Sequence, residues 1–144
     1  MLLTFTKPRF EQLIKDCVKV HTIRADKGNR WYIGTKIHFW LGNPRNTRGK
    51  VKPYQFGVGE VSRVETIRMD FACAEDWQQD AVYIADDIKL KTAEELNALA
   101  VNDGFESWSQ MKHWFVNDGG QYFGKIIFWK NFELVANDDA STVF

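Results

Sequence analysis

The amino-acid sequence predicts an α+β protein: a small, strongly bent or closed, mainly antiparallel β-sheet with short helices at one end. Three observations lead to this prediction. Short segments with alternating or continuous apolar residues follow one another along most of the chain, as strands do. Two helix start signals stand close together after residue 91, and a last apolar segment follows them. This order, with grouped helices, is typical of α+β folds.

Each element is predicted from its apolar pattern and from the residues that begin or end it. Strands are expected over residues 2–5, 18–24, 36–41, 54–71, 82–84, 88–90 and 122–129. The first helix begins around Pro8, because proline is favoured in a first turn. Thr92 and Glu95 have the spacing of a capping box, which predicts the start of a second helix. Ser107 and Gln110 indicate a third in the same way.

The predicted helices have buried faces and defined ends. The residues expected to face the core are Phe10, Leu13 and Ile14 in the first helix, Leu96, Leu99 and Ala100 in the second, and Met111, Trp114 and Phe115 in the third. The second helix is expected to stop at Asp103-Gly104, because glycine can take the left-handed conformation that ends many helices. The third is expected to end near Asn117.

The long segment over residues 54–71 is expected to be an irregular strand. Gly57 and Gly59 lie within it and indicate a bend of the kind that barrels need. Val58 and Val61 break the strict alternation of apolar and polar residues. We therefore expect a β-bulge, which would restore the phase.

Length and composition fit one globular domain. The chain has 144 residues, of which 44% are hydrophobic and 26% charged, as is ordinary for globular proteins. We assign residues 1–136 to the domain and 137–144 to a frayed C-terminal tail. Six Trp and eleven Phe are many for so short a chain and predict a ring-rich core and ring-lined surfaces, which suit nucleobases.

Other features concern the compartment. Charged residues from Lys7 onward interrupt the apolar start, so no signal peptide is expected. No apolar run approaches the roughly 18 residues of a membrane span. Cys17 and Cys73 are too few for a disulfide framework and lack metal-ligand spacing. We therefore expect a soluble, cytoplasmic protein with reduced thiols and no membrane association.

The net charge is zero, yet the two halves of the chain differ strongly. Residues 1–68 contain 14 Lys and Arg against 5 Asp and Glu, and residues 69–144 contain 5 against 14. The basic half suits an anionic partner, but interleaved halves would also neutralise each other. Residues 42–53 form a basic loop with Arg45, Arg48 and Lys50, which is either an arm that grips phosphates or a solvated connection.

The stretch from Lys19 to Arg24 is the most reactive part of the chain. It places an ammonium, an imidazole, a hydroxyl and a guanidinium within six residues, Lys-Val-His-Thr-Ile-Arg. In a regular strand Lys19 and Thr22 would point to opposite faces. If they cooperate, the chain must enter the strand through a bend or bulge near Lys19. A lysine beside an arginine and a threonine provides either a phosphate grip or an activated hydroxyl.

Several kinds of site are excluded by motifs that the sequence lacks. His21, His38 and His113 lie far apart, and no pair of His or Cys has the spacing of zinc ligands. A Gly-rich phosphate loop and a Gly-x-Ser-x-Gly elbow are both absent from the sequence. We therefore expect neither a metal nor a cofactor.

Three segments together resemble the ASCH domain, a relative of the PUA fold. They are Lys19-x-x-Thr22-Ile23-Arg24, the run from Leu99 to Trp108 between the last two helices, and the run from Trp31 to Gly42 with its Ile-His-Phe-Trp-Leu-Gly end. The resemblance, to bacterial and phage ASCH proteins, covers residues 2–129. It implies a compact PUA-like β-barrel with a cleft beside Lys19, Thr22 and Arg24 that binds RNA or a modified nucleoside.

The resemblance also implies a catalytic set. The ASCH proteins that are N4-acetylcytidine amidohydrolases use a Lys, a Thr three residues later and an acid that closes a helix, and by position these are Lys19, Thr22 and Asp103. As a base, Lys19 needs a pKa lowered from about 10.4 toward 7 to 8, by burial or by the nearby Arg24. Thr22 would attack the acyl carbonyl or hold the attacking water, and Asp103 would orient the lysine or the exocyclic amine.

Other functions stay open at this point. Some ASCH proteins resemble ribonucleases, which here would work without metal, and others are RNA-binding modules without catalysis. The nucleic-acid-binding residues would then be Arg24, Arg45, Arg48 and Lys50 for phosphates, and Trp31 and Trp40 for stacked bases. A further class is an interaction or assembly module in which the basic and acidic halves of separate copies dock. The sequence does not decide the substrate, the oligomeric state or whether the protein is an enzyme.

Overall fold

The structure is a computed structural model that describes residues 1–45, 52–71, 80–116 and 120–135. Its elements are β1 (Leu2–Phe5), α1 (Pro8–Lys15), β2 (His21–Arg24), β3 (Lys36–Leu41), β4 (Tyr54–Asp70), β5 (Ala81–Ile84), β6 (Ile88–Leu90), α2 (Ala93–Asn102), α3 (Trp108–Phe115) and β7 (Gln121–Leu134). The described part of the chain is thus α+β, as predicted. The predicted tail 137–144 and the middle of the basic loop lie outside the described residues.

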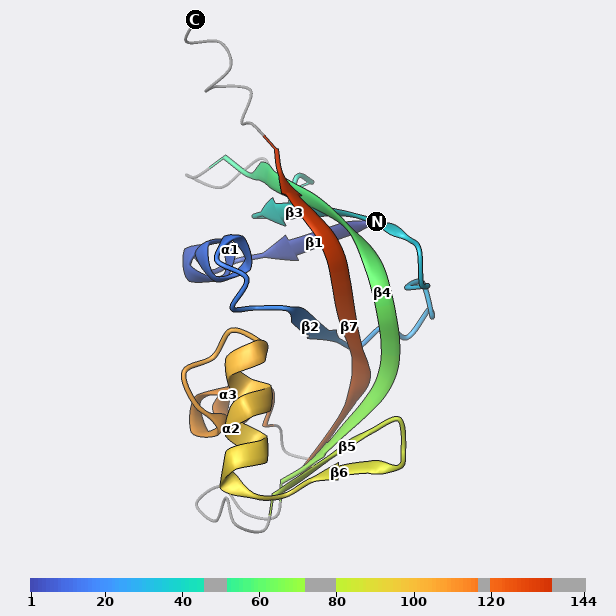
Figure 1. Ribbon diagram of the computed structural model, residues 1–144, viewed down its shortest axis with the longest axis vertical. Coiled ribbons are helices and arrows are strands. Elements are labelled where there is room, and N and C mark those ends of the chain that lie inside the picture. Colours follow the sequence, from blue (N-terminus) through green and yellow to red (C-terminus); the bar gives the residue numbers. More distant parts are fainter. Residues whose placement is uncertain (46–51, 72–79, 117–119, 136–144) are drawn as a thin grey trace, which may run out of the picture.

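One seven-stranded, mainly antiparallel sheet contains all the strands of the described residues. The long strands β4 and β7 run side by side and curve strongly, with the three helices on the concave side (Figure 1). β3 pairs with the first half of β4 and β5 with its end, while β2 pairs with β7. The one parallel pair joins β1 to β3. The sheet is open, and β1 and β2 both lie at its edges because each pairs with only one other strand.

The expected irregularity of the long strand is confirmed. The register between β4 and β7 shifts between Val58 and Glu60 and again between Val61 and Arg63. A β-bulge adds a residue to one strand and increases its local bend. Glycine at position 57 lets the Phe132 ring cross over the strand, because a Cβ there would come within 2.3 Å of that ring. The bend brings the ends of the sheet toward the helices.

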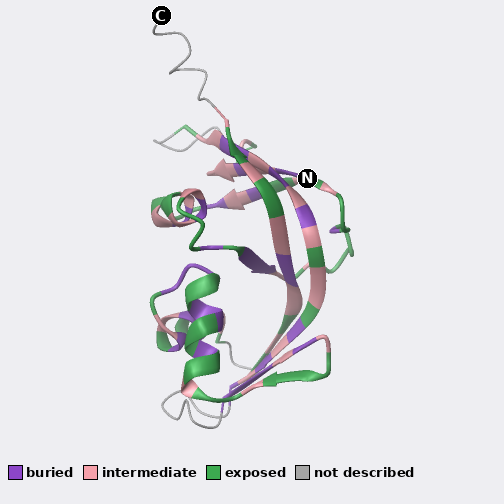
Figure 2. Cartoon of the chain, in the orientation of Figure 1, coloured by how far each residue is buried: buried purple, intermediate pink, exposed green. Residues whose placement is uncertain are grey.

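The core lies between the concave face of the sheet and the helices (Figure 2). The expected core residues of α2, which are Leu96, Leu99 and Ala100, are buried. In α3 the prediction for Trp114 is wrong, because this residue is 50% exposed. The buried face of α3 consists of Trp108, Met111 and Lys112 with Phe115 partly buried, a spacing of three and four residues that leaves Trp114 at its margin.

The caps that the sequence predicted begin both later helices. Thr92 and Glu95 form the complete capping box of α2. Ser107 Oγ accepts a hydrogen bond from the Gln110 N–H at the start of α3, but the Gln110 side chain accepts from the Glu106 N–H instead of closing the box on Ser107. None of the helices in the described ranges is long and apolar enough to cross a membrane.

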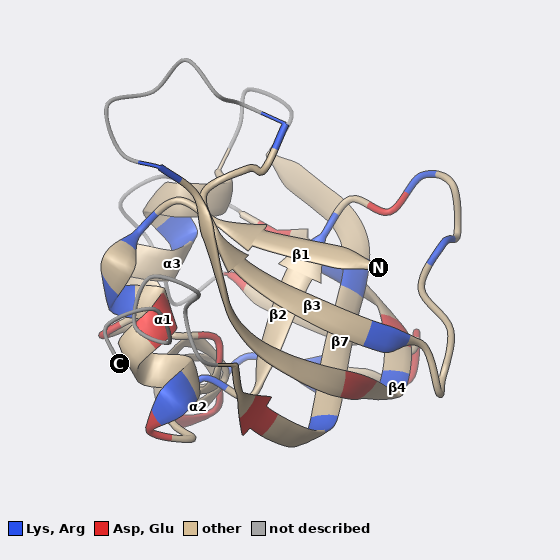
Figure 3. Cartoon of the chain, turned by 90° about the horizontal axis from the view of Figure 1, so that it is seen from above, with Lys and Arg blue, Asp and Glu red and all other residues tan. Residues whose placement is uncertain are grey.

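The sheet mixes the basic and acidic halves of the chain. β7 comes from the acidic half and lies between β2 and β4 from the basic half. Basic and acidic residues follow each other along β4 (Figure 3), and Arg68 and Asp70 pair at 3.2 Å across the point where the halves were divided. On this part of the surface the charges therefore neutralise one another, which was one of the two interpretations of the charge pattern.

Candidate functional site

A cavity of about 290 Å³ opens between β1, β2 and the turn that joins α2 to α3. The polar residues that line it include Thr4, Lys19, Thr22, Arg24 and Asp103. The three residues predicted to be catalytic thus meet in one cavity, together with the predicted arginine. This volume is at the small end of the range for ligand pockets, which begins at about 300 Å³.

The bend expected near Lys19 is present. β2 begins only at His21, and the backbone before it bonds to the helices: the Lys19 N–H donates to the Leu13 carbonyl at 3.0 Å, and the Val20 N–H to the Asn102 carbonyl at 2.9 Å. Lys19 therefore stands outside the strand, where strict alternation does not apply. Its side chain turns back along the strand, since its Nζ donates to the His21 carbonyl at 2.9 Å.

The Lys19 ammonium is buried and has a full set of acceptors. Its Nζ donates to the carbonyl oxygens of His21 and Asp103 and lies 3.3 Å from Asp103 Oδ1. The rings of Phe5 and Phe10 lie 5.6 and 5.1 Å from the same nitrogen. Burial lowers the pKa of Lys19 to about 8, against the opposing attraction of the Asp103 carboxylate. At pH 7 Lys19 is therefore neutral in about one tenth of the molecules.

Asp103 is the residue that ends α2. Its N–H donates to the carbonyls of Leu99 and Ala100, and its side chain is only 4% exposed. Gly104 follows with φ +96°, a conformation that favours glycine. A Cβ at Gly104 would also lie 2.9 Å from Lys19 Cδ. Glycine is therefore needed at position 104 for two reasons. The backbone has a positive φ there, and a side chain would prevent Lys19 from reaching the Asp103 carboxylate.

His21 belongs to the site, although sequence reasoning did not place it there. Its Nδ1 lies 3.0 Å from Asp103 Oδ1. An ionised carboxylate can only accept, so Nδ1 carries the hydrogen. The ring packs edge-on against Phe128 at 5.1 Å. Only its place in the reactive stretch pointed to this residue, because its partner is 82 residues away.

Arg24 holds the hydroxyl of Thr22. Its Nε donates to Thr22 Oγ1 at 3.3 Å, and its Nη2 donates to the Thr4 carbonyl at 2.8 Å. The guanidinium lies over the Phe5 ring at 5.1 Å. Since Thr22 Oγ1 accepts from the arginine, its own hydrogen is left to donate elsewhere. The Thr4 bond also joins two of the edge strands, β1 and β2, through a side chain.

Aromatic rings form the walls of the cavity, and the sequence indicated them only as a ring-rich composition. They are Phe5, Phe10, Phe105, Trp114 and Phe115. Trp114, half-exposed, packs edge-on against Phe10 and Phe105 at 6.0 and 5.7 Å between ring centroids. A cavity lined by aromatic rings and a few polar groups suits a planar heterocycle.

The other residues predicted to bind nucleic acid are not brought to this cavity. Trp31 is buried in the core, Trp40 is partly exposed on β3, and Arg45 is exposed beyond the end of that strand. Their proposed roles in stacking and phosphate contact stay predictions. Arg48 and Lys50 lie outside the described residues.

No protein-family model, curated protein or solved structure matches the chain. The ASCH resemblance therefore rests on the sequence motifs. Within the described ranges, no group of three or more His, Cys, Asp and Glu is arranged to hold a metal ion.

Proposed function

We propose that the protein is an ASCH-type hydrolase with a PUA-like barrel, which binds a modified nucleoside or RNA nucleotide and removes an acyl group from the exocyclic amine of the base. The observation that carries this proposal is that Lys19, Thr22 and Asp103 line one ring-walled cavity, with the pKa of Lys19 lowered to about 8 by burial. A lysine with such a pKa can take up and return a proton near neutral pH.

Binding would come from the rings and from the polar residues that line the cavity. A base that stacks on an aromatic side chain gains about 1 to 3 kcal/mol. Thr22 supplies a hydroxyl for the hydrogen-bonding edge of the base. Recognition by rings and a few polar groups suits cytosine with an acylated amine, because the acyl group adds both apolar surface and a carbonyl.

The reaction needs a nucleophile, a base and a proton donor. Neutral Lys19 accepts the proton of Thr22 Oγ1, and the oxygen forms a bond to the acyl carbon. The bond between the acyl carbon and the exocyclic nitrogen then breaks, and the Lys19 ammonium returns its proton to the leaving amine. Water hydrolyses the acyl-threonine ester, which releases the carboxylic acid and restores the hydroxyl. Arg24, which donates to Thr22 Oγ1, favours the alkoxide character of this oxygen.

Asp103 and His21 would act through Lys19 as positioning residues. The carboxylate accepts from Lys19 and His21 on the same oxygen, Oδ1, so the imidazole fixes the direction from which the carboxylate faces the ammonium. By its charge Asp103 also keeps the pKa of Lys19 from falling further.

Cleavage of RNA is the second candidate. In that reaction Lys19 would remove the proton of a ribose hydroxyl, and an arginine would be needed at the phosphate. Two of the three Arg24 nitrogens are already bonded to Thr22 and Thr4. The geometry therefore favours the amidohydrolase, in which Arg24 acts on the threonine.

The test is incubation of the purified protein with N4-acetylcytidine, with cytidine and acetate measured by chromatography. We expect turnover that falls at least about 100-fold in Lys19→Ala and in Thr22→Ala, the usual size of an acid–base contribution. Lys36→Ala is the matched control, because this lysine is exposed on β3. Turnover that survives in both site variants would overturn the mechanism. A wild type that cuts single-stranded RNA, or binds it without any reaction, would replace the amidohydrolase with a ribonuclease or a binding module.

A further inference from the structure

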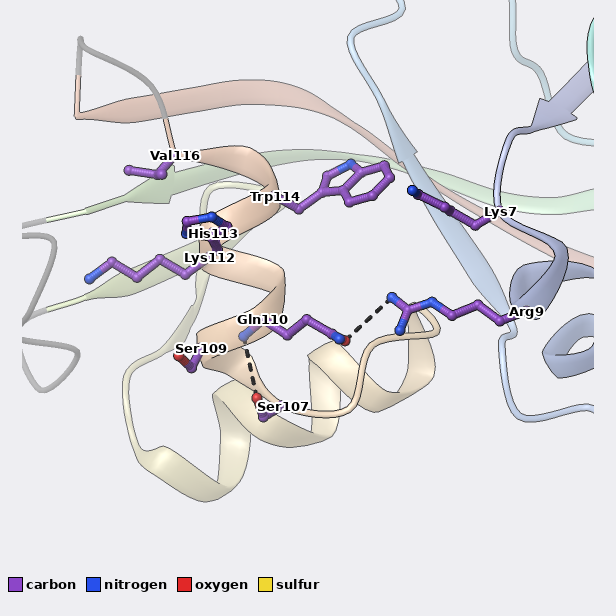
Figure 4. A pocket seen from close by; sticks show the side chains of 9 residues that line it. All are labelled: Lys7, Arg9, Ser107, Ser109, Gln110, Lys112, His113, Trp114 and Val116. Carbon is purple, nitrogen blue, oxygen red and sulfur yellow. Dashed lines mark hydrogen bonds between the residues drawn. The ribbon is translucent and has the colours of Figure 1, made fainter.

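A second, larger cavity adjoins the first one. It has a volume of about 750 Å³ and lies between the start of α1 and the exposed side of α3 (Figure 4). Trp114 lines both cavities, so one ring forms the boundary between them. We call this second cavity the α3 groove. The proposed function makes no use of it.

The α3 groove is positively charged. Lys7, Arg9 and His113 line it, and the described lining residues include no Asp or Glu. The Lys7 ammonium makes no hydrogen bond or ion pair with any described residue. In Figure 4 the side chains of Lys7, the residue before α1, and Arg9 of α1 reach toward Trp114 and Gln110 of α3. Lys112 also lines the groove, but its ammonium is paired with Asp80 at 2.8 Å.

Arg9 is held in place at the edge of the groove. Its Nη2 donates to Gln110 Oε1 at 3.4 Å, and its guanidinium lies over the rings of Phe10 and Phe105 at 5.1 and 5.7 Å. Phe10 and Phe105 also line the first cavity. The cation of the groove and the ring walls of the base cavity are thus parts of one packed unit, which favours a single ligand that occupies both.

We propose that the α3 groove binds the phosphate and the flanking nucleotide of a single-stranded RNA whose modified base lies in the first cavity. The inference rests on the proposed function and names its substrate class: a nucleotide within a chain, not a free nucleoside. Base and phosphate alternate along a nucleotide chain, and the two cavities place ring walls next to a groove lined by cations, with the half-exposed Trp114 at their boundary. Phosphate contacts supply affinity, while a stacked ring tolerates any neighbouring base.

The experiment compares the binding of four ligands by calorimetry: N4-acetylcytidine, its 5′- and 3′-monophosphates, and a trinucleotide with N4-acetylcytidine in the middle. The Thr22→Ala protein is used so that no ligand is hydrolysed. We expect the trinucleotide to bind at least tenfold more tightly than the nucleoside at low salt, and this advantage to shrink as salt is raised. Lys7→Gln should weaken trinucleotide binding at least threefold and leave nucleoside binding unchanged. Lys36→Gln is the control with the same change of charge.

The outcomes separate the two proposals. Failure of all four ligands to bind both the Thr22→Ala protein and the wild-type protein would overturn the proposed function. Equal affinity for nucleoside and trinucleotide, with no effect of Lys7→Gln, would overturn the inference and leave the proposed function standing. If a monophosphate bound as tightly as the trinucleotide, the groove would bind the phosphate of a free nucleotide, and the inference that it binds an RNA chain would be wrong. Competition by an acidic peptide, without any advantage of the trinucleotide, would also overturn the inference.

Discussion

The ammonium nitrogen of Lys19 lies 3.3 Å from a carboxylate oxygen of Asp103, although 84 residues separate them in the chain. Burial and this ion pair act on the lysine in opposite directions: burial lowers its pKa, the carboxylate raises it, and the result is about 8. The site therefore has a base that changes its charge close to physiological pH. Four of the five predictions below depend on this pair or on the turn that forms it.

The first prediction concerns the pH dependence of activity. If neutral Lys19 is the base, kcat/KM should rise about tenfold per pH unit below pH 8 and level off above it, because the neutral fraction follows that course. The measurement is a pH profile with N4-acetylcytidine over pH 5.5 to 9.5. A rate that falls on going from pH 6 to pH 8 would show that the ammonium is the active form.

The second prediction tests Asp103 as a positioning residue. Asp103→Asn removes the negative charge that raises the pKa of Lys19, so the midpoint of the pH profile should move to a lower pH. A residue with a merely structural role would lower the rate without moving the midpoint. Circular dichroism of the variant checks that it is folded, and Asp16→Asn, an exposed carboxylate beyond α1, is the control.

Local signals predicted much of the fold. The bounds of β1 and β3 agree with the sequence prediction, and the cap of α2 is present, because alternation and capping act between near neighbours. The sequence predicted Trp114 in the core because the apolar face of the α3 segment is broad. Only the packing of the helix against the sheet shows which side of that face is buried, and Trp114 lies on the other side.

The candidate site was predictable only in part. Lys19 and Thr22 were singled out by the reactive stretch itself and Asp103 by the family resemblance, and the bend near Lys19 followed from the need to bring the first two together. The bond between His21 and Asp103 joins segments 82 residues apart, and no local pattern encodes such a contact. The α3 groove arises from the approach of α1 to α3, which is set by tertiary packing.

The third prediction concerns stability. The pKa of Lys19 falls from 10.5 to about 8 on folding, so between these two pH values the unfolded chain binds more protons than the folded one. The free energy of unfolding should therefore rise with pH over this window, by about 3 kcal/mol in total from this residue. The measurement is urea denaturation from pH 7 to 10.5. Lys19→Met should lack this rise, and parallel curves for the two proteins would contradict the assignment.

The fourth prediction concerns Gly104. Alanine at this position would be strained at φ +96°, and its Cβ would lie 2.9 Å from Lys19 Cδ. We expect Gly104→Ala to lower the free energy of unfolding by about 1 to 3 kcal/mol and to lower activity as well, since the lysine must shift. Gly28→Ala is the control, because a Cβ there meets only the flexible Arg30 side chain at 3.4 Å. Equal stability of the two variants would count against this account of the turn.

The fifth prediction concerns the buried pair that holds α3 in place. The Lys112 ammonium lies 2.8 Å from Asp80 Oδ2, which also accepts from Trp108 Nε1 at 2.9 Å. Asp80→Asn would remove the carboxylate charge that the buried ammonium faces, and breaking a buried pair typically costs about 3 to 5 kcal/mol.

Urea denaturation measures this loss of stability, and an exposed ion pair serves as the control for comparison. Arg63 and Glu65 pair at 3.1 Å with side chains that are 48% and 31% exposed, so Glu65→Gln should cost less than about 1 kcal/mol. The Asp80 variant should also lose RNA affinity in the α3 groove, because Trp114 and Gln110 are carried by the same helix. A loss of less than 1 kcal/mol in Asp80→Asn would mean that packing of Trp108 and Met111 alone positions α3.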